Sequence, residues 1–226
     1  MAELILALDL PSGGDALRLL DRVSTLRWVK VGSVLMTREG APFIRELTSR
    51  GLQVFLDLKW HDIPNTVRGA VAAGRDQGVS MVTVHALGGA EMMAAAASAA
   101  GTEVGVVGVT VLTSHDAESY RGATGRDRVD LAEEVARQAR NAVAAGLRGI
   151  VCSPLEVATV RAVLPQGAWI VVPGIRRGGD ASGDQARVAG PAEAVAAGAT
   201  HLVVGRPILQ ATDPAAMVAR FLEEMG

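Results

Sequence analysis

The sequence is poor in cysteine, in aromatic residues and in excess charge of either sign. Its 226 residues include one cysteine, Cys152, so no disulfide can form within the chain. The apolar residues before Cys152 predict a buried side chain and not a nucleophile. Aromatic residues make up 3% of the chain and the formal net charge is −2. A nucleic-acid-binding surface is not expected, because it needs a basic patch and aromatic platforms for the bases.

Long apolar runs are also missing. No stretch is long and apolar enough to predict a membrane-spanning helix. The N-terminus carries Glu3 where a secretion signal carries basic residues, and its apolar run stops at Asp9. We therefore expect a soluble, cytoplasmic protein with no membrane partner.

Short apolar runs alternate along the chain with longer segments of helical period. The runs are rich in Val, Ile or Leu, as expected of parallel strands that are buried on both faces. The predicted strands are 4–8, 28–31, 54–58, 81–84, 104–110, 149–151, 169–172 and 201–204. The predicted helices are 15–24, 37–50, 66–77, 90–99, 129–145, 155–163, 191–197 and 214–224, and several are followed by Gly.

Eight strand–helix units in one chain favour a closed barrel over an open doubly wound sheet. The open sheet usually has fewer strands and often a Gly-x-Gly-x-x-Gly turn, which this sequence lacks. No linker or change in composition divides the chain. The expected fold is α/β, a single-domain (β/α)8 TIM barrel that forms one catalytic domain over residues 1–226.

Three charged residues follow the third predicted strand within six positions, in the sequence Asp-Leu-Lys-Trp-His-Asp-Ile-Pro-Asn-Thr from Asp57 to Thr66. Asp57 and Lys59 are two residues apart, so on an extended chain they face the same side. An ion pair would explain them, but burying such a pair costs desolvation free energy that the attraction need not recover. Catalysis is the sharper hypothesis for this stretch.

Polar residues lie at or just after the ends of the predicted strands. Active sites of β/α barrels lie at this end, and isolated charges there would add little stability. The pattern therefore predicts one ring of functional groups around the barrel mouth. Its members are Asp9, Lys30, Asp57, Lys59, His85, Thr110, Thr113, Ser153, Arg176, Gly205 and Arg206.

The last two loops of the predicted barrel have the features of a phosphate site. Gly205 allows close approach of the backbone, Arg206 offers a planar set of donors, and Pro207 suits the first turn of a helix. Arg176 adds a second guanidinium group. The alternative, that Arg206 is only a surface cation, is less favourable because a cation at a helix N-terminus opposes the helix dipole unless an anion lies between them.

Residues 177–187, between these two loops, are polar and rich in Gly. This composition predicts a mobile lid that closes over the substrate, with Gln185 as its phosphate contact. A surface loop without function is the alternative, since Gly content alone is weak evidence.

Residues 57–66 resemble the Asp-x-Lys-x-x-Asp-Ile-Pro-Asn-Thr motif of the orotidine 5′-phosphate decarboxylase family, in its bacterial form. Asp-x-Lys-x-x-Asp alone is shared with related sugar-phosphate enzymes, so further blocks are needed for specificity. Such blocks occur in the family's order over nearly the full chain, at 7–9, 29–32, 84–86, 112–114, 172–176, 184–187 and 204–208.

The resemblance implies decarboxylation of orotidine 5′-monophosphate (OMP) to uridine 5′-monophosphate (UMP), the last step of de novo pyrimidine nucleotide synthesis, without metal or cofactor. It implies that Lys59 donates a proton to pyrimidine C6 and that Asp57 lies beside the departing carboxylate. Lys30 and Asp62 complete an alternating array of charges. In this family the second aspartate enters from the partner subunit, so Asp62 implies a homodimer.

The resemblance also implies the substrate contacts. Asp9 and Lys30 would bind ribose hydroxyls, and Thr113 the pyrimidine. The phosphate would be held by Arg176, Gln185, Gly205 and Arg206, and the remaining expected substrate-binding residues are Asp57, Ile63, Thr66 and Pro173. No family role is carried over to Ser153, and His85 is as consistent with a structural histidine as with a substrate neighbour.

Two other interpretations remain open. A metal-dependent sugar-phosphate lyase of the same superfamily, such as hexulose-phosphate synthase, would hold Mg²⁺ with the aspartates. It needs further oxygen ligands, and no acidic residue follows Lys30 until Glu39. A non-catalytic nucleotide-binding protein is expected to have lost the charged array, which is complete here.

Overall fold

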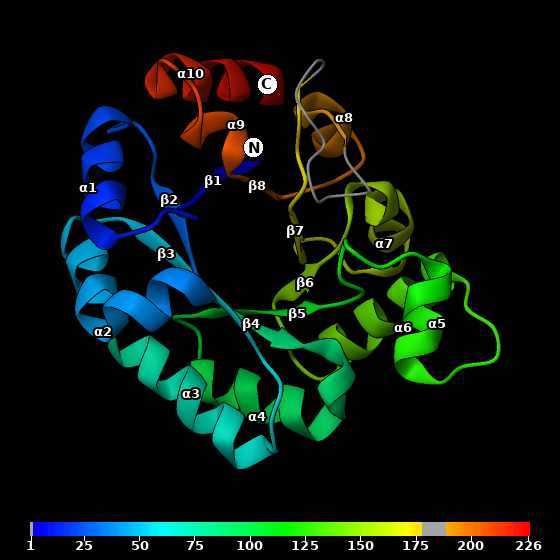
Figure 1. Ribbon diagram of the computed structural model, residues 1–226. Coiled ribbons are helices and arrows are strands. Elements are labelled where there is room, and N and C mark those ends of the chain that lie inside the picture. Colours follow the sequence, from blue (N-terminus) through cyan, green and yellow to red (C-terminus); the bar gives the residue numbers. More distant parts are fainter. Residues whose placement is uncertain (1, 178–188) are drawn as a thin grey trace.

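Eight parallel strands form a closed barrel in chain order, with helices around its outside (Figure 1). The structure is a computed structural model that describes residues 2–177 and 189–226. The strands are β1 Glu3–Ala7, β2 Trp28–Gly32, β3 Gln53–Trp60, β4 Met81–His85, β5 Gly105–Val109, β6 Gly149–Val151, β7 Trp169–Val172 and β8 His201–Val204. Because β1 pairs with both β2 and β8, the sheet has no free edge. The predicted (β/α)8 barrel is confirmed.

Helices cover the outer face of the barrel, and all eight predicted helices are present with shifted ends. The helices are α1 Gly13–Arg22, α2 Ser33–Ser49, α3 Pro64–Asp76, α4 Gly89–Ala100, α5 Ala117–Thr124, α6 Leu131–Ala144, α7 Val157–Val163, α8 Pro191–Ala196, α9 Arg206–Leu209 and α10 Pro214–Met225, with short 3₁₀ turns η1 Ala86–Gly88 and η2 Pro154–Glu156. The pattern did not predict α5, in which Tyr120 is the one buried residue. The helix start expected after Gly205 is present as the four-residue α9. Of the helices in the described residues, none is long and apolar enough to cross a membrane.

Apolar side chains form two layers, one between strands and helices and one inside the barrel. The inner layer consists of Ile5, Ala7, Trp28, Phe55, Met81, Val107, Val171 and Val203. Alternating side chains from neighbouring strands fill the interior, so the barrel encloses a packed core and not a pore. Functional groups are therefore confined to the two ends of the barrel.

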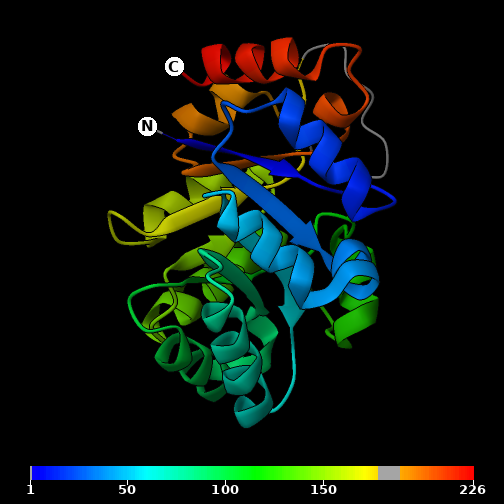
Figure 2. The ribbon, with the colours of Figure 1, turned by 90° about the vertical axis from the view of Figure 1, so that its left-hand side faces the viewer.

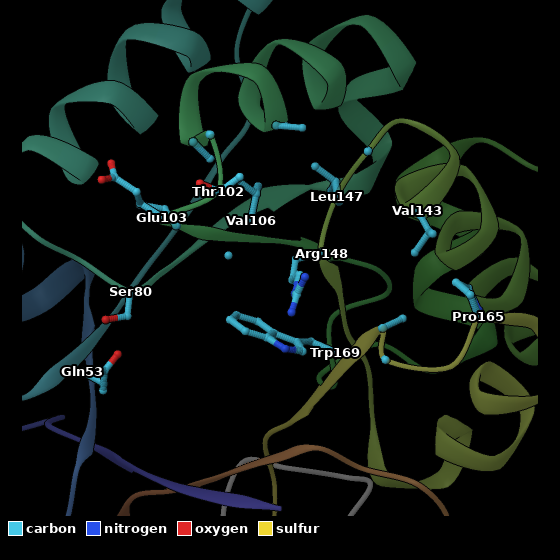
Figure 3. A pocket seen from close by; sticks show the side chains of 18 of the residues that line it. Gln53, Ser80, Thr102, Glu103, Val106, Val143, Leu147, Arg148, Pro165 and Trp169 are labelled. Atoms are coloured by element: carbon cyan, nitrogen blue, oxygen red, sulfur yellow. The ribbon is translucent and has the colours of Figure 1, made fainter.

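Aromatic rings close the end of the barrel at which the strands begin. The ring of Trp169 lies 6.4 Å from that of Trp28 and 4.8 Å from that of His201, measured between centroids. A β-carbon at Gly105 would lie 2.0 Å from the Trp169 ring, so glycine is needed there. Outside this plug is a hollow of about 720 Å³, in which Arg148 covers the Trp169 ring (Figure 3).

The two chain ends lie near each other beside β1 and α10 (Figures 1 and 2). α10 packs against α1, α8 and α9, and so covers the strands β1 and β8 that close the barrel. Its buried residues, Pro214, Val218, Phe221 and Met225, face the core. The closing pair of strands is thus protected from water by the last helix of the chain.

Candidate active site

A cavity of about 490 Å³ opens at the end of the barrel where the strands finish. Apolar side chains from the strands form its floor, among them Phe55, Val109, Val171 and Val203. The polar lining is formed by Asp9, Lys30, Asp57, Lys59, Thr113, Arg176 and Arg206, with Pro173 and Gly205 beside them. Eight of the eleven residues of the predicted ring therefore line one cavity, whereas His85, Thr110 and Ser153 do not.

Asp57 lies between two lysines. Its Oδ1 atom accepts a hydrogen bond of 2.9 Å from Lys59 Nζ, and its Oδ2 atom is 3.7 Å from Lys30 Nζ. Lys30 Nζ also donates to Asp9 Oδ1 at 3.1 Å. The four groups form a row of alternating charge in the order Asp9, Lys30, Asp57, Lys59. Lys30 and Asp57 are nearly buried, whereas the side chain of Lys59 is 40% exposed and accessible to a ligand.

The lysines keep Asp57 ionised. Burial alone would raise the pKa of Asp57, but the positive charges of Lys30 and Lys59 outweigh it, together with hydrogen bonds from Lys59 and Thr83. The resulting pKa of Asp57 lies below its ordinary value. At neutral pH the site therefore presents a fixed negative charge next to the Lys59 ammonium group.

An irregularity in β3 directs Lys59 into the cavity. Leu56 pairs with Val82 and Trp60 with Val84, so β3 has two more residues than β4 over this interval. Lys59 has a φ of 52° and is the only non-glycine residue in the described chain with positive φ. Such a conformation costs of order 1 kcal/mol and persists where surrounding contacts enforce it. Asp57 and Lys59 therefore do not lie on the regular extended chain that the sequence predicts, although their side chains are still in contact.

Thr83 makes the contacts that stabilise this irregularity, and the pattern of strand ends did not predict it. Its Oγ1 atom accepts a hydrogen bond of 2.8 Å from the Lys59 backbone N–H and donates one of 3.1 Å to Asp57 Oδ1. Thr83 is fully buried in β4. A hydroxyl group within the otherwise apolar run 81–84 is the one signal in the sequence that points to Thr83.

Asp62, Ile63 and Thr66 do not line the cavity of their own chain. They lie on the exposed turn between β3 and α3 and on the first turn of α3. Asp62 Oδ1 accepts a hydrogen bond of 2.6 Å from the Ile63 backbone N–H, and Ile63 is 67% exposed. These three are the predicted site residues that the described barrel does not bring together with the rest.

The expected phosphate end lies between β7 and α9. Arg176 is buried, and its Nη1 atom donates to the Ile175 carbonyl at 2.8 Å. The Arg176 backbone N–H donates to the Ala189 carbonyl at 3.0 Å. Gly205 precedes α9, whose first turn contains Pro207, as the sequence predicts. The predicted lid contact Gln185 lies outside the described residues.

Other members of the predicted ring have structural contacts. Ser153 caps η2 by accepting from the Leu155 backbone N–H, and Thr110 donates to the Val151 carbonyl, which ties β5 to β6. His85 stacks on His61 with centroids 5.4 Å apart, and burial, with the charges of His61 and Lys59, lowers the pKa of His85. Cys152 is buried, as predicted.

The fold and the charged cavity together define an enzyme of the β/α-barrel class. The chain belongs to the orotidine 5′-phosphate decarboxylase / HUMPS family, whose model matches residues 2–221. The orotidine 5′-phosphate decarboxylase of Alkalilimnicola ehrlichii is 50% identical over 230 residues, which cover 100% of this chain and 97% of that protein. The enzyme of the same name from Halorhodospira halophila is 49% identical over 230 residues, covering 99% and 96%.

A solved structure agrees with these relatives. The crystal structure of orotidine 5′-phosphate decarboxylase from Lactobacillus acidophilus matches with a TM-score of 0.89 and 34% identity, and the match covers 100% of both chains. The resemblance that the motifs indicate is thus confirmed over the full chain.

Proposed function

We propose that this chain decarboxylates OMP to UMP and CO₂, as a carboxy-lyase that uses neither metal nor organic cofactor. The family and the names of the relatives support this activity. The observation in the chain itself that carries the proposal is the hydrogen bond of 2.9 Å between Lys59 and Asp57 at the cavity mouth. This pair places a proton donor and a fixed negative charge side by side above an apolar floor.

Lys59 is the proton donor in this proposal. Breaking the bond between pyrimidine C6 and the carboxyl carbon releases CO₂ and leaves the electron pair on C6. A fixed ammonium group stabilises this charge as it forms, and its proton then bonds to C6. Lys59 is left neutral and regains a proton from water. Asp57 repels the substrate carboxylate, and this repulsion ends as neutral CO₂ departs.

The remaining residues bind the substrate. Asp9 and Lys30 contact the ribose hydroxyls, and Thr113 contacts the pyrimidine. Two guanidinium groups and backbone N–H groups match the charge and geometry of a phosphate. The phosphate-binding residues are Arg176, Gln185, Gly205 and Arg206, and Pro173 lines the wall next to them. Residues 1–226 as one catalytic domain and a cytoplasmic location stay predictions.

A homodimer completes the site in the same proposal. Asp62, Ile63 and Thr66 lie outside their own cavity, and the apolar side chain of Ile63 is 67% exposed. An exposed apolar side chain beside a carboxylate suits an interface in which both enter the neighbouring mouth. Asp62 then adds the last charge of the array to the site of the partner.

A metal-dependent lyase is disfavoured by the contacts of Asp57. Its Oδ1 accepts from Lys59 and Thr83, and its Oδ2 faces Lys30, so the carboxylate is already occupied by positive groups that would repel a cation. The absorbance change of OMP, measured without added metal and again with EDTA, tests the proposal. We expect equal rates; a rate that EDTA abolishes and Mg²⁺ restores would contradict it.

The Lys59→Ala variant tests the role of Lys59 in the same assay. General acid catalysis contributes roughly 10²- to 10⁴-fold to a rate, and we expect a loss of at least about that size in kcat. The Arg148→Gln variant, which changes a cation at the opposite end of the barrel, is the control and should keep the parent rate. Decarboxylation by Lys59→Ala at the parent rate would show that Lys59 is not the acid.

A further inference from the structure

The segment between β5 and α6 forms part of the cavity wall with its first residues and then lies on the outside of the barrel. Leu112 and Thr113 line the cavity, whereas α5, only a few residues later, lies on the outside. We propose that Glu134 and Tyr120 are positioning residues that hold the turn from Leu112 to His115, and with it Thr113, in the wall of the active site. The inference rests on the proposed function, because it names Thr113 as a substrate contact.

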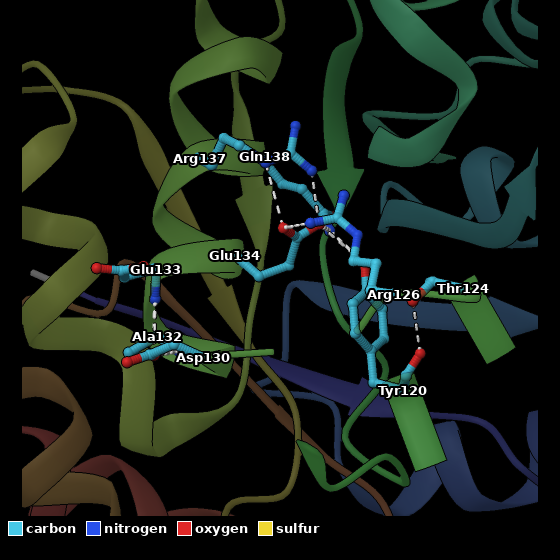
Figure 4. A network of polar contacts seen from close by, with 9 residues as sticks. All are labelled: Tyr120, Thr124, Arg126, Asp130, Ala132, Glu133, Glu134, Arg137 and Gln138. Atoms are coloured by element: carbon cyan, nitrogen blue, oxygen red, sulfur yellow. Dashed lines mark hydrogen bonds and ion pairs between the residues drawn. The ribbon is translucent and has the colours of Figure 1, made fainter. Parts of the chain in front are cut away.

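Glu134 is the centre of a buried polar cluster (Figure 4). Its side chain is 5% exposed and accepts hydrogen bonds from Tyr120 Oη at 2.9 Å, Arg126 Nη1 at 2.7 Å, Arg137 Nη2 at 2.6 Å and Gln138 Nε2 at 2.8 Å. Burial would raise the pKa of Glu134, but the hydrogen bonds from Arg137, Gln138 and Tyr120 outweigh it and lower the pKa to about 2. Glu134 is therefore an ionised anchor at any physiological pH.

The cluster attaches the segment between β5 and α6, residues 110–130, to α6. Tyr120 belongs to α5, Arg126 lies between α5 and α6, and Glu134 lies in the N-terminal part of α6. Tyr120 is the one buried side chain of α5, so its ring and hydroxyl group are the main attachment of that helix to the protein. Glu134 thus holds the segment between β5 and α6 through Tyr120 and Arg126, which are six residues apart in sequence.

A chain of contacts continues from Tyr120 to the cavity wall. The Tyr120 ring meets the His115 ring edge to face, with centroids 6.0 Å apart. The His115 backbone N–H donates to the Leu112 carbonyl at 3.0 Å, which closes the turn that contains Thr113. A shift of Tyr120 is therefore passed to Thr113 through two contacts.

Stability alone does not account for the cluster. Removing the Glu134 carboxylate and its buried partners Tyr120 and Gln138 from water costs free energy, and apolar side chains of similar volume often stabilise a protein as well or better. A directional network of donors from four residues instead fixes the orientation of the groups that it joins. This is the property that a wall residue of an active site requires.

The decisive variant is Tyr120→Phe, which removes the hydroxyl group and keeps the ring. The hydroxyl group donates to Glu134 Oε1 and accepts from Gln138 Nε2, so we expect kcat/KM for OMP to fall about fivefold or more. Arg126→Gln removes one hydrogen bond to Glu134, and we expect a fall of about fivefold. Arg50→Gln, which breaks two surface ion pairs at the other end of the barrel, is the matched control and should keep the parent value. An unchanged kcat/KM in both Tyr120→Phe and Arg126→Gln would overturn the inference.

A double-mutant cycle with Thr113→Ala separates positioning from general structural damage. If Tyr120 acts through Thr113, Tyr120→Phe should cause no further loss of kcat/KM in the Thr113→Ala background. An equal fold loss in both backgrounds would overturn the positioning role. Parent protein that does not convert OMP would contradict the proposed function instead.

Hydrogen exchange gives a readout that is independent of activity. We expect Tyr120→Phe to speed amide exchange over residues 111–116 while exchange in the barrel strands stays as in the parent. Unchanged exchange over 111–116 would overturn the positioning role whatever the chain catalyses.

Discussion

The Thr83 hydroxyl group lies between the Lys59 backbone and the Asp57 side chain, since it accepts from the Lys59 N–H at 2.8 Å and donates to Asp57 Oδ1 at 3.1 Å. One hydroxyl group can do both because it has one donor and two acceptor positions. It holds Lys59 in its positive-φ conformation and orients the carboxylate that Lys59 contacts. Thr83 therefore couples the shape of β3 to the geometry of the proposed proton donor.

The Thr83→Val variant should lose activity while keeping the volume of the side chain. Without the hydroxyl group, the Lys59 N–H loses its acceptor and Asp57 loses a donor, each worth about 1 kcal/mol. We expect kcat/KM for OMP to fall about tenfold or more and the pKa of Asp57 to rise. Steady-state kinetics measure the first effect, and Thr83→Ser, which keeps the hydroxyl group, is the control. Parent activity in Thr83→Val would contradict this role.

Shared sites can be detected by mixing two inactive variants. Lys59→Ala damages the site of its own chain, whereas Asp62→Ala should damage the site of the partner. A hybrid dimer then has one site with both defects and one intact site. Random reassembly after mild denaturation should restore about a quarter of the parent sites. Each variant reassembled alone is the control, and a mixture that stays inactive would contradict the exchange of Asp62 between subunits.

The contribution of Glu134 to stability should depend on pH. The folded-state pKa of Glu134 is about 2, below its ordinary value of 4.5, so its ionised form stabilises the fold above pH 4.5. This contribution is lost as the pH falls from 4.5 toward 2. In urea unfolding, the difference between parent and Glu134→Gln should be large at pH 7 and smaller at pH 3. The control is Glu118→Gln, because Glu118 is exposed on α5. If the difference in unfolding free energy between the parent and Glu118→Gln changed with pH as much as that for Glu134→Gln, the low pKa of Glu134 would not be the cause.

The aromatic plug should affect stability and not catalysis. In Gly105→Ala the new β-carbon would lie 2.0 Å from the Trp169 ring, and such overpacking typically costs about 1–3 kcal/mol. We expect a lower melting temperature with kcat/KM unchanged in the folded fraction. Gly69→Ala is the matched control, because Gly69 lies within α3 with open space around it and should gain about 0.5–1 kcal/mol. Equal melting temperatures for the two variants would contradict the packing argument.

Much of the architecture was readable from local patterns. The strands 149–151, 169–172 and 201–204 have the predicted bounds, because buried parallel strands are short unbroken apolar runs. Eight such runs with helices between them leave few alternatives to a closed barrel. Helix α5, in the segment between β5 and α6, was not predicted, because a helix with one buried residue has no apolar periodicity.

The sequence by itself determined which residues stand at the strand ends, and so the composition of the candidate site, since parallel strands of a barrel all finish at one mouth. Tertiary structure alone decided how those residues meet. The irregularity of β3, the capture of the Lys59 N–H by Thr83, and the position of Asp62 outside its own cavity depend on β3 lying against β4. Such contacts join residues that are distant along the chain, and a pattern of neighbouring residues does not predict them.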